Sequence, residues 1–277
     1  MHITRHALLL LALLSLAACK NEAPAPVTDA ATAPTSQAKG ASAEDPQAAA
    51  AAAATLKAAE EAAAKAPALK EGVDYVLIPT GQTFDTPPGK VEVVEYFGYV
   101  CPFCAAVEPT VAAMRRKLPA DVHFVTVPAA FGGTWDNYAK AYYAAEAMGL
   151  LDKTHEAMFR AIHIDQTLKG ERGMDAPEDI AAFYANYGAD PKQFLAGMQS
   201  FAVAAKINHA RQAMTAAYAN GDQMGTPTFV VNGKYRVKGK SMDDMFRILN
   251  QLMMAERAKL GATAPPASAP ATATPQG

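Results

Sequence analysis

Runs of apolar, β-branched residues predict the strands in the first half of the folded region. VDYVLIP at 73–79 predicts a short strand. VEVVEYF at 91–97 is largely apolar, which predicts a strand buried on both faces. DVHFVTVP at 121–128 predicts a third strand, and a helical pattern fills 101–118 between the second and third. The first half therefore alternates strands with one helix.

The next part of the chain is a block of helical patterns from about residue 134 to 220. Turn signals at Gly149, Lys169-Gly170 and Gly188 divide the block into several helices. No internal repeat is evident in it. The block is long enough to form a domain of its own between two groups of strands.

Strand patterns return at 228–231 and 234–237. Asn232-Gly233 joins them, and this pair is typical of the type I′ turn of a β-hairpin. A last helix is predicted from Ser241, because Asp244 stands three residues further on as a capping partner. The chain thus closes its folded region with a hairpin and a helix.

The order of these elements predicts an α/β protein that is similar to a thioredoxin fold with an inserted helical domain. We assign residues 71–133 and 221–261 to the thioredoxin-like domain and residues 134–220 to the insertion. Residues 19–70 are a low-complexity stretch, which predicts a linker, and residues 262–277 predict a disordered tail, because both lack the large apolar residues that a core needs.

Part of the linker has a strong preference for helix. QAAAAAAATLKAAEEAAAK at 47–65 is rich in alanine and other good helix formers. It shows no apolar stripe that a folded domain could bury, so we predict a semi-rigid spacer. Such a spacer lets the folded part stand off a membrane.

The N-terminus has the pattern of a bacterial signal peptide at residues 1–18. Arg5 gives a positive flank, and the apolar run that follows is too short to span a bilayer. Leu16-Ala17-Ala18-Cys19 resembles the bacterial lipobox, which implies cleavage before Cys19 and acylation of that residue. The alternative is an ordinary signal peptide with an incidental Cys19. We predict a periplasmic protein, lipid-anchored to the inner or the outer membrane.

Composition narrows the classes of function. A formal net charge of −2 argues against nucleic-acid binding, which needs a basic surplus. The chain has 277 residues and three cysteines, of which Cys101 and Cys104 fall in the folded region. One pair is too few for a disulfide-stapled mini-protein and is natural for a redox dithiol.

The pair stands in the segment Cys101-Pro102-Phe103-Cys104, directly after the predicted buried strand. Pro102 suits the first position of a helix, so Cys101 would cap that helix, where unpaired N–H groups favour a thiolate. A strand that leads into a CxxC at a helix start is typical of redox chemistry. A zinc half-site and a static disulfide are the alternatives, although zinc needs two more ligands and no second cysteine pair exists.

Three segments of the chain together resemble the DsbA family of periplasmic thiol-disulfide oxidoreductases. They are EYFGYVCPFC at 95–104, THEAMFRAIH at 154–163 and GTPTF at 225–229. The resemblance implies that Cys101 is the nucleophile that enters a mixed disulfide with a substrate. It implies that Cys104 is the resolving thiol.

The same resemblance assigns roles to other residues. It implies that Pro227 is a cis-proline facing the CxxC and that Thr226 offers backbone groups to an extended substrate. An ordinary trans proline at the start of an edge strand is the alternative. The family has an acidic residue at the position of Glu95, thought to assist proton transfer from the buried cysteine; a glutamate that reaches solvent is the alternative. Glu108 also matches an acidic position, although exposed helix glutamates are common.

The dipeptide between the cysteines departs from the strongly oxidising members of the family, which carry Pro-His. Here the pair is Pro102-Phe103. Since a phenylalanine adds no charge and no N–H group near the thiolate, we predict a less depressed pKa for Cys101 and a milder oxidant.

The resemblance also implies partners. The substrates would be unfolded or reduced exported proteins, and a DsbB-like membrane quinone reductase would reoxidise the dithiol. We expect a monomer with no metal or organic cofactor. One alternative keeps the fold but makes the protein a reductase or isomerase that a DsbD-like partner keeps reduced. The other is a non-catalytic lipoprotein whose helical block binds a partner and whose disulfide is structural.

Overall fold

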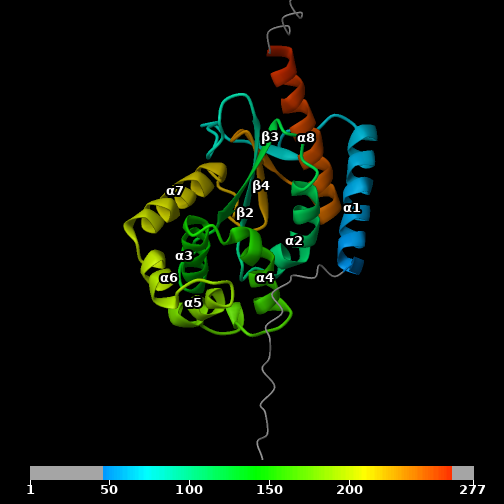
Figure 1. Cartoon of the computed structure of the whole chain (residues 1–277). Coiled ribbons are helices and arrows are strands. Elements are labelled where there is room, and N and C mark those ends of the chain that lie inside the picture. The colour runs from blue at the N-terminus through cyan, green and yellow to red at the C-terminus, as the bar shows by residue number, and fades with distance from the viewer. Residues whose placement is uncertain (1–45, 264–277) are drawn as a thin grey trace, which may run out of the picture. The chain divides into compact units, whose positions relative to one another are not determined.

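A computed structural model describes residues 46–263; the predicted signal peptide, Cys19 and the C-terminal tail lie outside the described residues. Its centre is a five-stranded sheet in the order β1-β5-β4-β2-β3 (Figure 1). Strands β2 and β3 are parallel, and the other neighbouring pairs are antiparallel. The strands are β1 Tyr75–Leu77, β2 Val91–Phe97, β3 Val122–Pro128, β4 Thr228–Val231 and β5 Tyr235–Val237.

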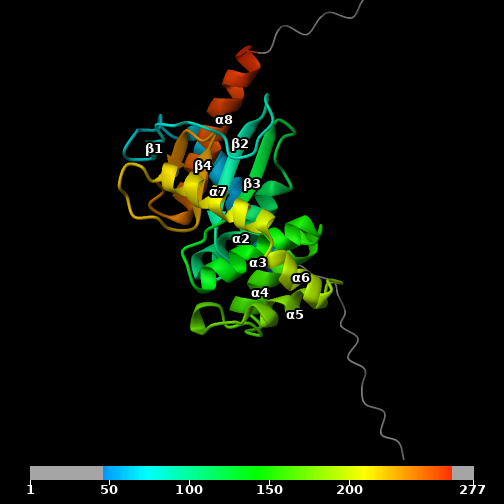
Figure 2. The same cartoon turned by 90° about the vertical axis from the view of Figure 1, so that its left-hand side faces the viewer.

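The helices form two groups. In Figure 1, α1, α2 and α8 lie beside one another, while α3 to α6 gather beyond one end of the strands and α7 runs along the sheet (Figure 2). This second group comes from the predicted helical block. The bounds are α1 Pro46–Lys65, α2 Pro102–Arg115, α3 Thr134–Ala147, α4 Leu151–His163, α5 Pro177–Ala185, α6 Pro191–Met198, α7 Phe201–Ala217 and α8 Met242–Thr263, with a 3₁₀ turn at Gly170–Arg172.

Strand β2 is buried along its whole length, as the sequence predicts. Side chains alternate between the faces of a strand. Val91 and Val93 accordingly belong to the core under α2 and α8, whereas Val94 and Tyr96 belong to the core shared with α3, α4 and α7. Strand β2 thus supplies side chains to both hydrophobic cores. The segment that follows its C-terminal end is therefore attached to a rigid part of the molecule.

The hairpin and the start of α8 form as the sequence predicts. Asn232 and Gly233 have φ angles of 51° and 63°, as a type I′ turn requires. A Cβ atom on Gly233 would lie 1.9 Å from the carbonyl oxygen of Gln82, so only glycine fits there. At α8, the Asp244 N–H donates to Ser241 Oγ at 3.2 Å, which caps the helix.

Helix α1 forms where the sequence predicts a helix, but it is not a spacer that stands apart from the domain. It packs against α2 and α8, and its Ala52, Leu56 and Ala63 are buried. The expectation that it has no apolar face to bury is therefore wrong. Alanine side chains are small enough to let the helices approach closely, so a stripe of alanine with a single leucine suffices.

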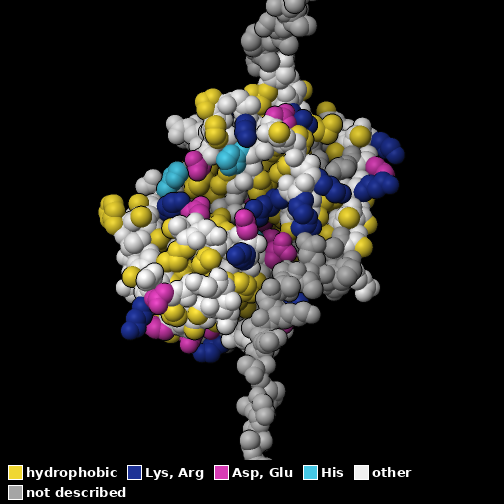
Figure 3. All heavy atoms as spheres, viewed as in Figure 1, with side chains coloured by type: hydrophobic (Ala, Val, Ile, Leu, Met, Phe, Trp, Pro, Cys, Tyr) yellow, Lys and Arg dark blue, Asp and Glu magenta, His cyan; other side chains and the backbone are white. Residues whose placement is uncertain are grey.

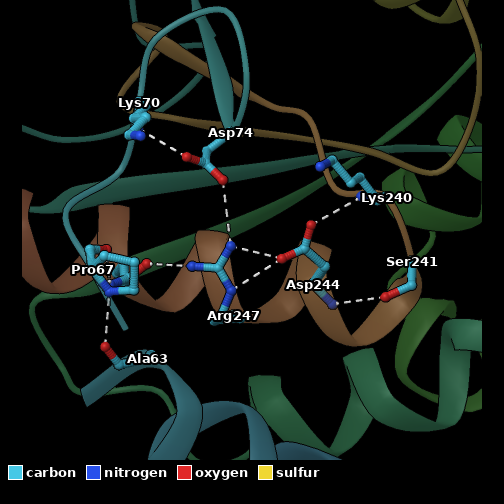
Figure 4. A network of polar contacts seen from close by, with 9 residues as sticks. Ala63, Pro67, Lys70, Asp74, Lys240, Ser241, Asp244 and Arg247 are labelled. Atoms are coloured by element: carbon cyan, nitrogen blue, oxygen red, sulfur yellow. Dashed lines mark hydrogen bonds and ion pairs between the residues drawn. The ribbon is translucent and has the colours of Figure 1, made fainter. Parts of the chain in front are cut away.

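The segment that follows α1 is held to α8 by the polar contacts drawn in Figure 4. Arg247 donates to Asp244 at 2.6 Å and to Asp74 at 3.4 Å. Gln251 Nε2 donates to the carbonyl oxygen of Ala63 at 3.2 Å. These contacts fix the end of α1 against the domain before the chain enters β1.

We predict that Leu56→Ala lowers the free energy of unfolding by about 2–3 kcal/mol, the lower part of the range for a buried leucine, because α1 can withdraw from the domain instead of leaving a cavity. Leu56 is 2% exposed. Urea unfolding, with hydrogen exchange of the α1 amides, measures both effects.

The matched control is Lys57→Ala, one residue along the same helix, where the side chain is 78% exposed. Its effect should stay within about 0.5 kcal/mol. Equal stability of the Leu56→Ala protein and the unaltered protein would show that α1 does not contribute to the fold in solution.

Candidate active site

The two cysteines lie where β2 passes into α2. Cys101 caps the helix with an extended backbone, and Pro102 occupies the first turn, as predicted. The Cys104 N–H donates to Cys101 Sγ at 3.4 Å. The loop before them depends on Gly98, because a Cβ atom there would lie 2.1 Å from the ring of Trp135.

The surroundings of Cys101 favour its thiolate. Hydrogen bonds from the side chains of Cys104 and Thr226 lower the pKa of Cys101, and so do hydrogen bonds from the backbone N–H groups of Cys104 and Phe103. Together they bring this pKa to about 6, against the opposing effect of burial. The start of a helix adds a favourable dipole. Cys101 is therefore suited to be a nucleophile and a leaving group near neutral pH.

Cys104 has the opposite character. It is 1% exposed, and burial, with the hydrogen bond and the negative charge of Cys101, raises its pKa strongly. This thiol stays protonated when the Cys101 thiolate is present. The site thus favours the ionised form of one cysteine and the neutral form of the other, which suits the attacking and resolving roles that the family resemblance implies.

The loop before β4 faces the cysteines. The Thr226–Pro227 peptide bond is cis, as predicted, and the Cys101 thiol donates to the carbonyl oxygen of Thr226 at 3.4 Å. Tyr218 and Thr228 hold this loop, since the two hydroxyl groups lie 2.6 Å apart and Thr228 Oγ1 donates to the carbonyl oxygen of Gly225 at 2.8 Å. The backbone of the loop is thus positioned beside the reactive sulfur.

Glu95 lies inside the protein, so the alternative of a glutamate that reaches solvent is excluded. It is 1% exposed on the α2 side of β2, between Thr126 of β3 and Phe229 of β4. Burial, and then the negative charge of Glu108, raise the pKa of Glu95 well above the usual range of a carboxyl group. Burial therefore favours the protonated form of this carboxyl, the form that can donate a proton.

In the sequence, Glu108 only matches an acidic family position, and His155 stands in the segment at 154–163 without an assigned role. Glu108 is 5% exposed, and its Oε2 lies 3.6 Å from Nε2 of His155 on α4. Glu108 stands two helical turns after Cys101, a spacing that puts both on one face of α2. That spacing is the signal that could have placed Glu108 under the cysteines.

Phe103 lies at the surface and is 63% exposed. Pro102 is also exposed, so the dipeptide between the cysteines faces solvent. Within residues 46–263, no group of three or more His, Cys, Asp or Glu side chains could hold a metal ion. Over the same residues no helix is both long enough and apolar enough to span a bilayer.

A nucleophilic thiol at a helix start, a buried partner thiol and a cis-proline loop on this sheet define a thiol-disulfide oxidoreductase with a thioredoxin fold. The model of the DSBA-like thioredoxin domain matches residues 92–252. The thiol:disulfide interchange protein DsbA of Pseudomonas aeruginosa is 41% identical over 174 residues, which are 62% of this chain and 78% of that protein. The DsbA of Burkholderia cepacia is 36% identical and is matched over 76% of its length.

Solved structures agree. The crystal structure of the oxidoreductase DsbA from Xylella fastidiosa is 40% identical and matches with a TM-score of 0.63, over 69% of this chain and 98% of that chain. The crystal structure of Pseudomonas aeruginosa DsbA is 37% identical and matches with a TM-score of 0.61, over 70% of this chain and 97% of that chain. The chain belongs to the DsbA family, and it is an enzyme that exchanges thiols and disulfides.

We predict that Cys101 in the reduced protein titrates near pH 6, because hydrogen bonds stabilise its thiolate. Cys104 should resist alkylation at neutral pH, since burial keeps it protonated. The pH dependence of iodoacetamide alkylation, with the modified residue identified by mass, measures both. A midpoint in the range of a free thiol, about 8.5, would contradict the prediction.

The same thiolate should affect stability. The pKa of Cys101 in the folded protein lies below the value of about 8.5 in the unfolded chain. The thiolate therefore contributes fully to the free energy of unfolding above about pH 8.5, and this contribution is lost as the pH falls through about 6. The reduced protein should therefore gain stability over Cys101→Ser as the pH rises through this interval, in urea unfolding at a series of pH values.

Proposed function

We propose that the protein is a periplasmic disulfide donor: its Cys101–Cys104 disulfide passes to reduced, newly exported proteins. The observation that carries this proposal is the contrast between the two thiols, one with a pKa of about 6 and one held neutral by burial. A stabilised thiolate lowers the free energy of the reduced form, so the disulfide form tends to give its disulfide away.

The strength of this oxidant follows from the same pKa. A value of about 6 lies between the values of about 7 for thioredoxin and about 3.5 for a strongly oxidising DsbA. Phe103 contributes no charge that could lower it further. The protein would therefore be a milder oxidant than the members that carry Pro-His.

The proposal assigns partners to each half of the cycle. An unfolded substrate would lie against the backbone at Thr226 and Pro227 while its sulfur joins Cys101. A DsbB-like membrane quinone reductase would then reoxidise the dithiol, and the enzyme would act as a monomer. A protein kept reduced by a DsbD-like partner is the second candidate, because a Cys101 pKa of about 6 lies nearer to the value of about 7 for thioredoxin than to the value of about 3.5 for a strongly oxidising DsbA.

The reduction potential, measured by equilibration with glutathione, tests the direction of electron flow. We expect a value between about −270 mV, as in thioredoxin, and about −120 mV, as in the strongly oxidising DsbA. Phe103→His should make the protein more oxidising by about 30 mV, which corresponds to one unit of thiolate pKa.

Phe103→Leu is the matched control, since it removes the ring without adding charge, and it should keep the potential of the unaltered protein. A potential at the thioredoxin end for the unaltered protein would favour the reductase. An equal shift in the His and Leu variants would show that charge at this position does not set the potential.

We further propose that Cys19 is acylated and ties the enzyme to a bacterial membrane. The lipobox resemblance of Leu16-Ala17-Ala18-Cys19 supports this. The residues between Cys19 and the start of α1 at Pro46 would then form the tether, and α1 would belong to the enzyme rather than to the tether.

Replacing Cys19 with serine should move the protein from the membrane fraction to the soluble periplasmic fraction without changing the reduction potential. Acyl chains contribute about 0.8 kcal/mol for each buried methylene, so their loss abolishes stable binding. Cell fractionation and the mass of the mature N-terminus measure the outcome. If the unaltered protein is already soluble and unmodified, residues 1–18 are an ordinary signal peptide.

A further inference from the structure

Three ionisable side chains from three elements meet beneath the cysteines. Glu95 comes from β2, Glu108 from α2 and His155 from α4, and they are 1%, 5% and 7% exposed. The charge of Glu108 acts on Glu95, and Glu108 Oε2 lies 3.6 Å from His155 Nε2. The order from the inside outward is therefore Glu95, Glu108, His155.

Each of these side chains keeps one polar atom without a hydrogen bond to the protein. The atoms are Glu95 Oε2, Glu108 Oε1 and His155 Nε2. Leaving buried polar atoms without a protein partner is costly, so native proteins keep few of them unless water or function uses them. Three such atoms in one series indicate a path along which protons can move.

His155 is held in one orientation. Its Nδ1 lies 2.9 Å from the hydroxyl group of Tyr99, and its ring packs edge-on against Phe97. These contacts turn Nε2 toward Glu108. Because one ring nitrogen of an imidazole can accept a proton while the other donates, this placement suits proton transfer between Glu108 and the groove.

His155 also reaches the surface on the other side. It lines a groove of about 390 Å³ between α2, β3, α3 and α4, together with Ala112, Arg115, Thr126 and Tyr142. Ala112 lies about 16 Å along the helix axis from Cys101, at a rise of about 1.5 Å per residue. Figure 3 shows Lys and Arg side chains gathered near the middle of this face. The distance between Cys101 and Ala112 therefore places the groove away from the N-terminal end of α2, where substrate would bind.

We propose that His155 carries protons between the buried Glu95–Glu108 pair and solvent in this groove. Cys104 would then exchange its proton through a face of the molecule apart from the one that substrate covers. The inference rests on the proposed function, because only a thiol that alternates between disulfide and thiol needs such a path.

A substrate thiolate attacks Cys101 Sγ, the Cys101–Cys104 bond breaks, and Cys104 leaves as a thiolate. Protonated Glu95 gives this thiolate a proton and becomes a carboxylate, which regains a proton through Glu108 from His155. His155 takes its replacement from solvent. When Cys104 resolves a mixed disulfide on Cys101, the protons move in the reverse direction. Cys104 first gives its proton to the Glu95 carboxylate, from where it leaves through Glu108 and His155, and the Cys104 thiolate then attacks Cys101 Sγ.

The charged and titratable groups around His155 come from each element packed against it. They are Glu108, Arg115 and Arg116 of α2, Tyr99 of the loop after β2, Tyr142 of α3, and Asp152 and Glu156 of α4 itself. The mouth of the groove therefore carries side chains of both signs of charge. His155 is the group that joins this mouth to the interior.

The test mixes reduced protein with excess oxidised glutathione, so that attack of Cys104 on the Cys101–glutathione disulfide limits the rate. Samples are quenched with acid and the species separated by mass. We expect His155→Ala to slow this step at least about tenfold, since general acid–base groups contribute about 10²–10⁴-fold. The pH dependence of the step should change as well. Alkylation of Cys101 should not slow.

Added imidazole should restore the rate of His155→Ala, because the vacated site opens to the groove. His155→Gln, which fills the site but cannot relay protons, should be slow and should not respond to imidazole. The control is His209→Ala, an exposed residue of α7, which should resolve the disulfide at the unaltered rate.

An unaltered resolution rate in both His155 variants would overturn the inference. So would a lowered rate that imidazole does not restore in His155→Ala and that keeps the pH dependence of the unaltered protein. Failure of the proposed function is read separately, from the equilibrium potential of the unaltered protein, which does not depend on how fast protons move.

Discussion

The hydrogen bond from the Cys104 N–H to Cys101 Sγ at 3.4 Å depends on the whole strand–helix unit around it. Strand β2 must end at the right place, Pro102 must start α2, and Gly98 must let the loop pass under Trp135. Once these conditions hold, one sulfur meets unpaired N–H groups and the other is buried behind it. The difference between the two thiols follows from position and needs no charged side chain between them.

The burial that makes the two thiols differ in pKa also has a cost in stability. A strand with seven buried residues carries Glu95 into the interior, where a neutral carboxyl without a full set of partners lowers stability. On the neighbouring strand β4, Glu95 pairs with Phe229, which is itself fully buried. Native proteins keep few buried polar groups without partners, and here the carboxyl acts electrostatically on both Cys101 and Cys104.

Local patterns were sufficient for much of the fold. The β2 strand, the helix start at Cys101 and the Asn232-Gly233 hairpin each follow from a few adjacent residues, and the structure has them. The packing of α1 could not be predicted this way, because Ala52 and Leu56 do not stand out from the surrounding alanines. The contact between Glu108 and His155 could not be predicted either, since α2 and α4 come together only in the folded protein.

Helix α2 connects these features, because it contacts α1 on one side and α4 on another while its N-terminal end carries the cysteines. Packing from α1 adds buried apolar area next to Val107 and Val111, on the helix that also carries the buried Glu108. Apolar burial contributes about 25 cal/mol for each Å² removed from water, so a docked helix can offset part of the cost of a buried carboxylate. A segment whose composition indicates a linker thus supports the geometry of the thiols.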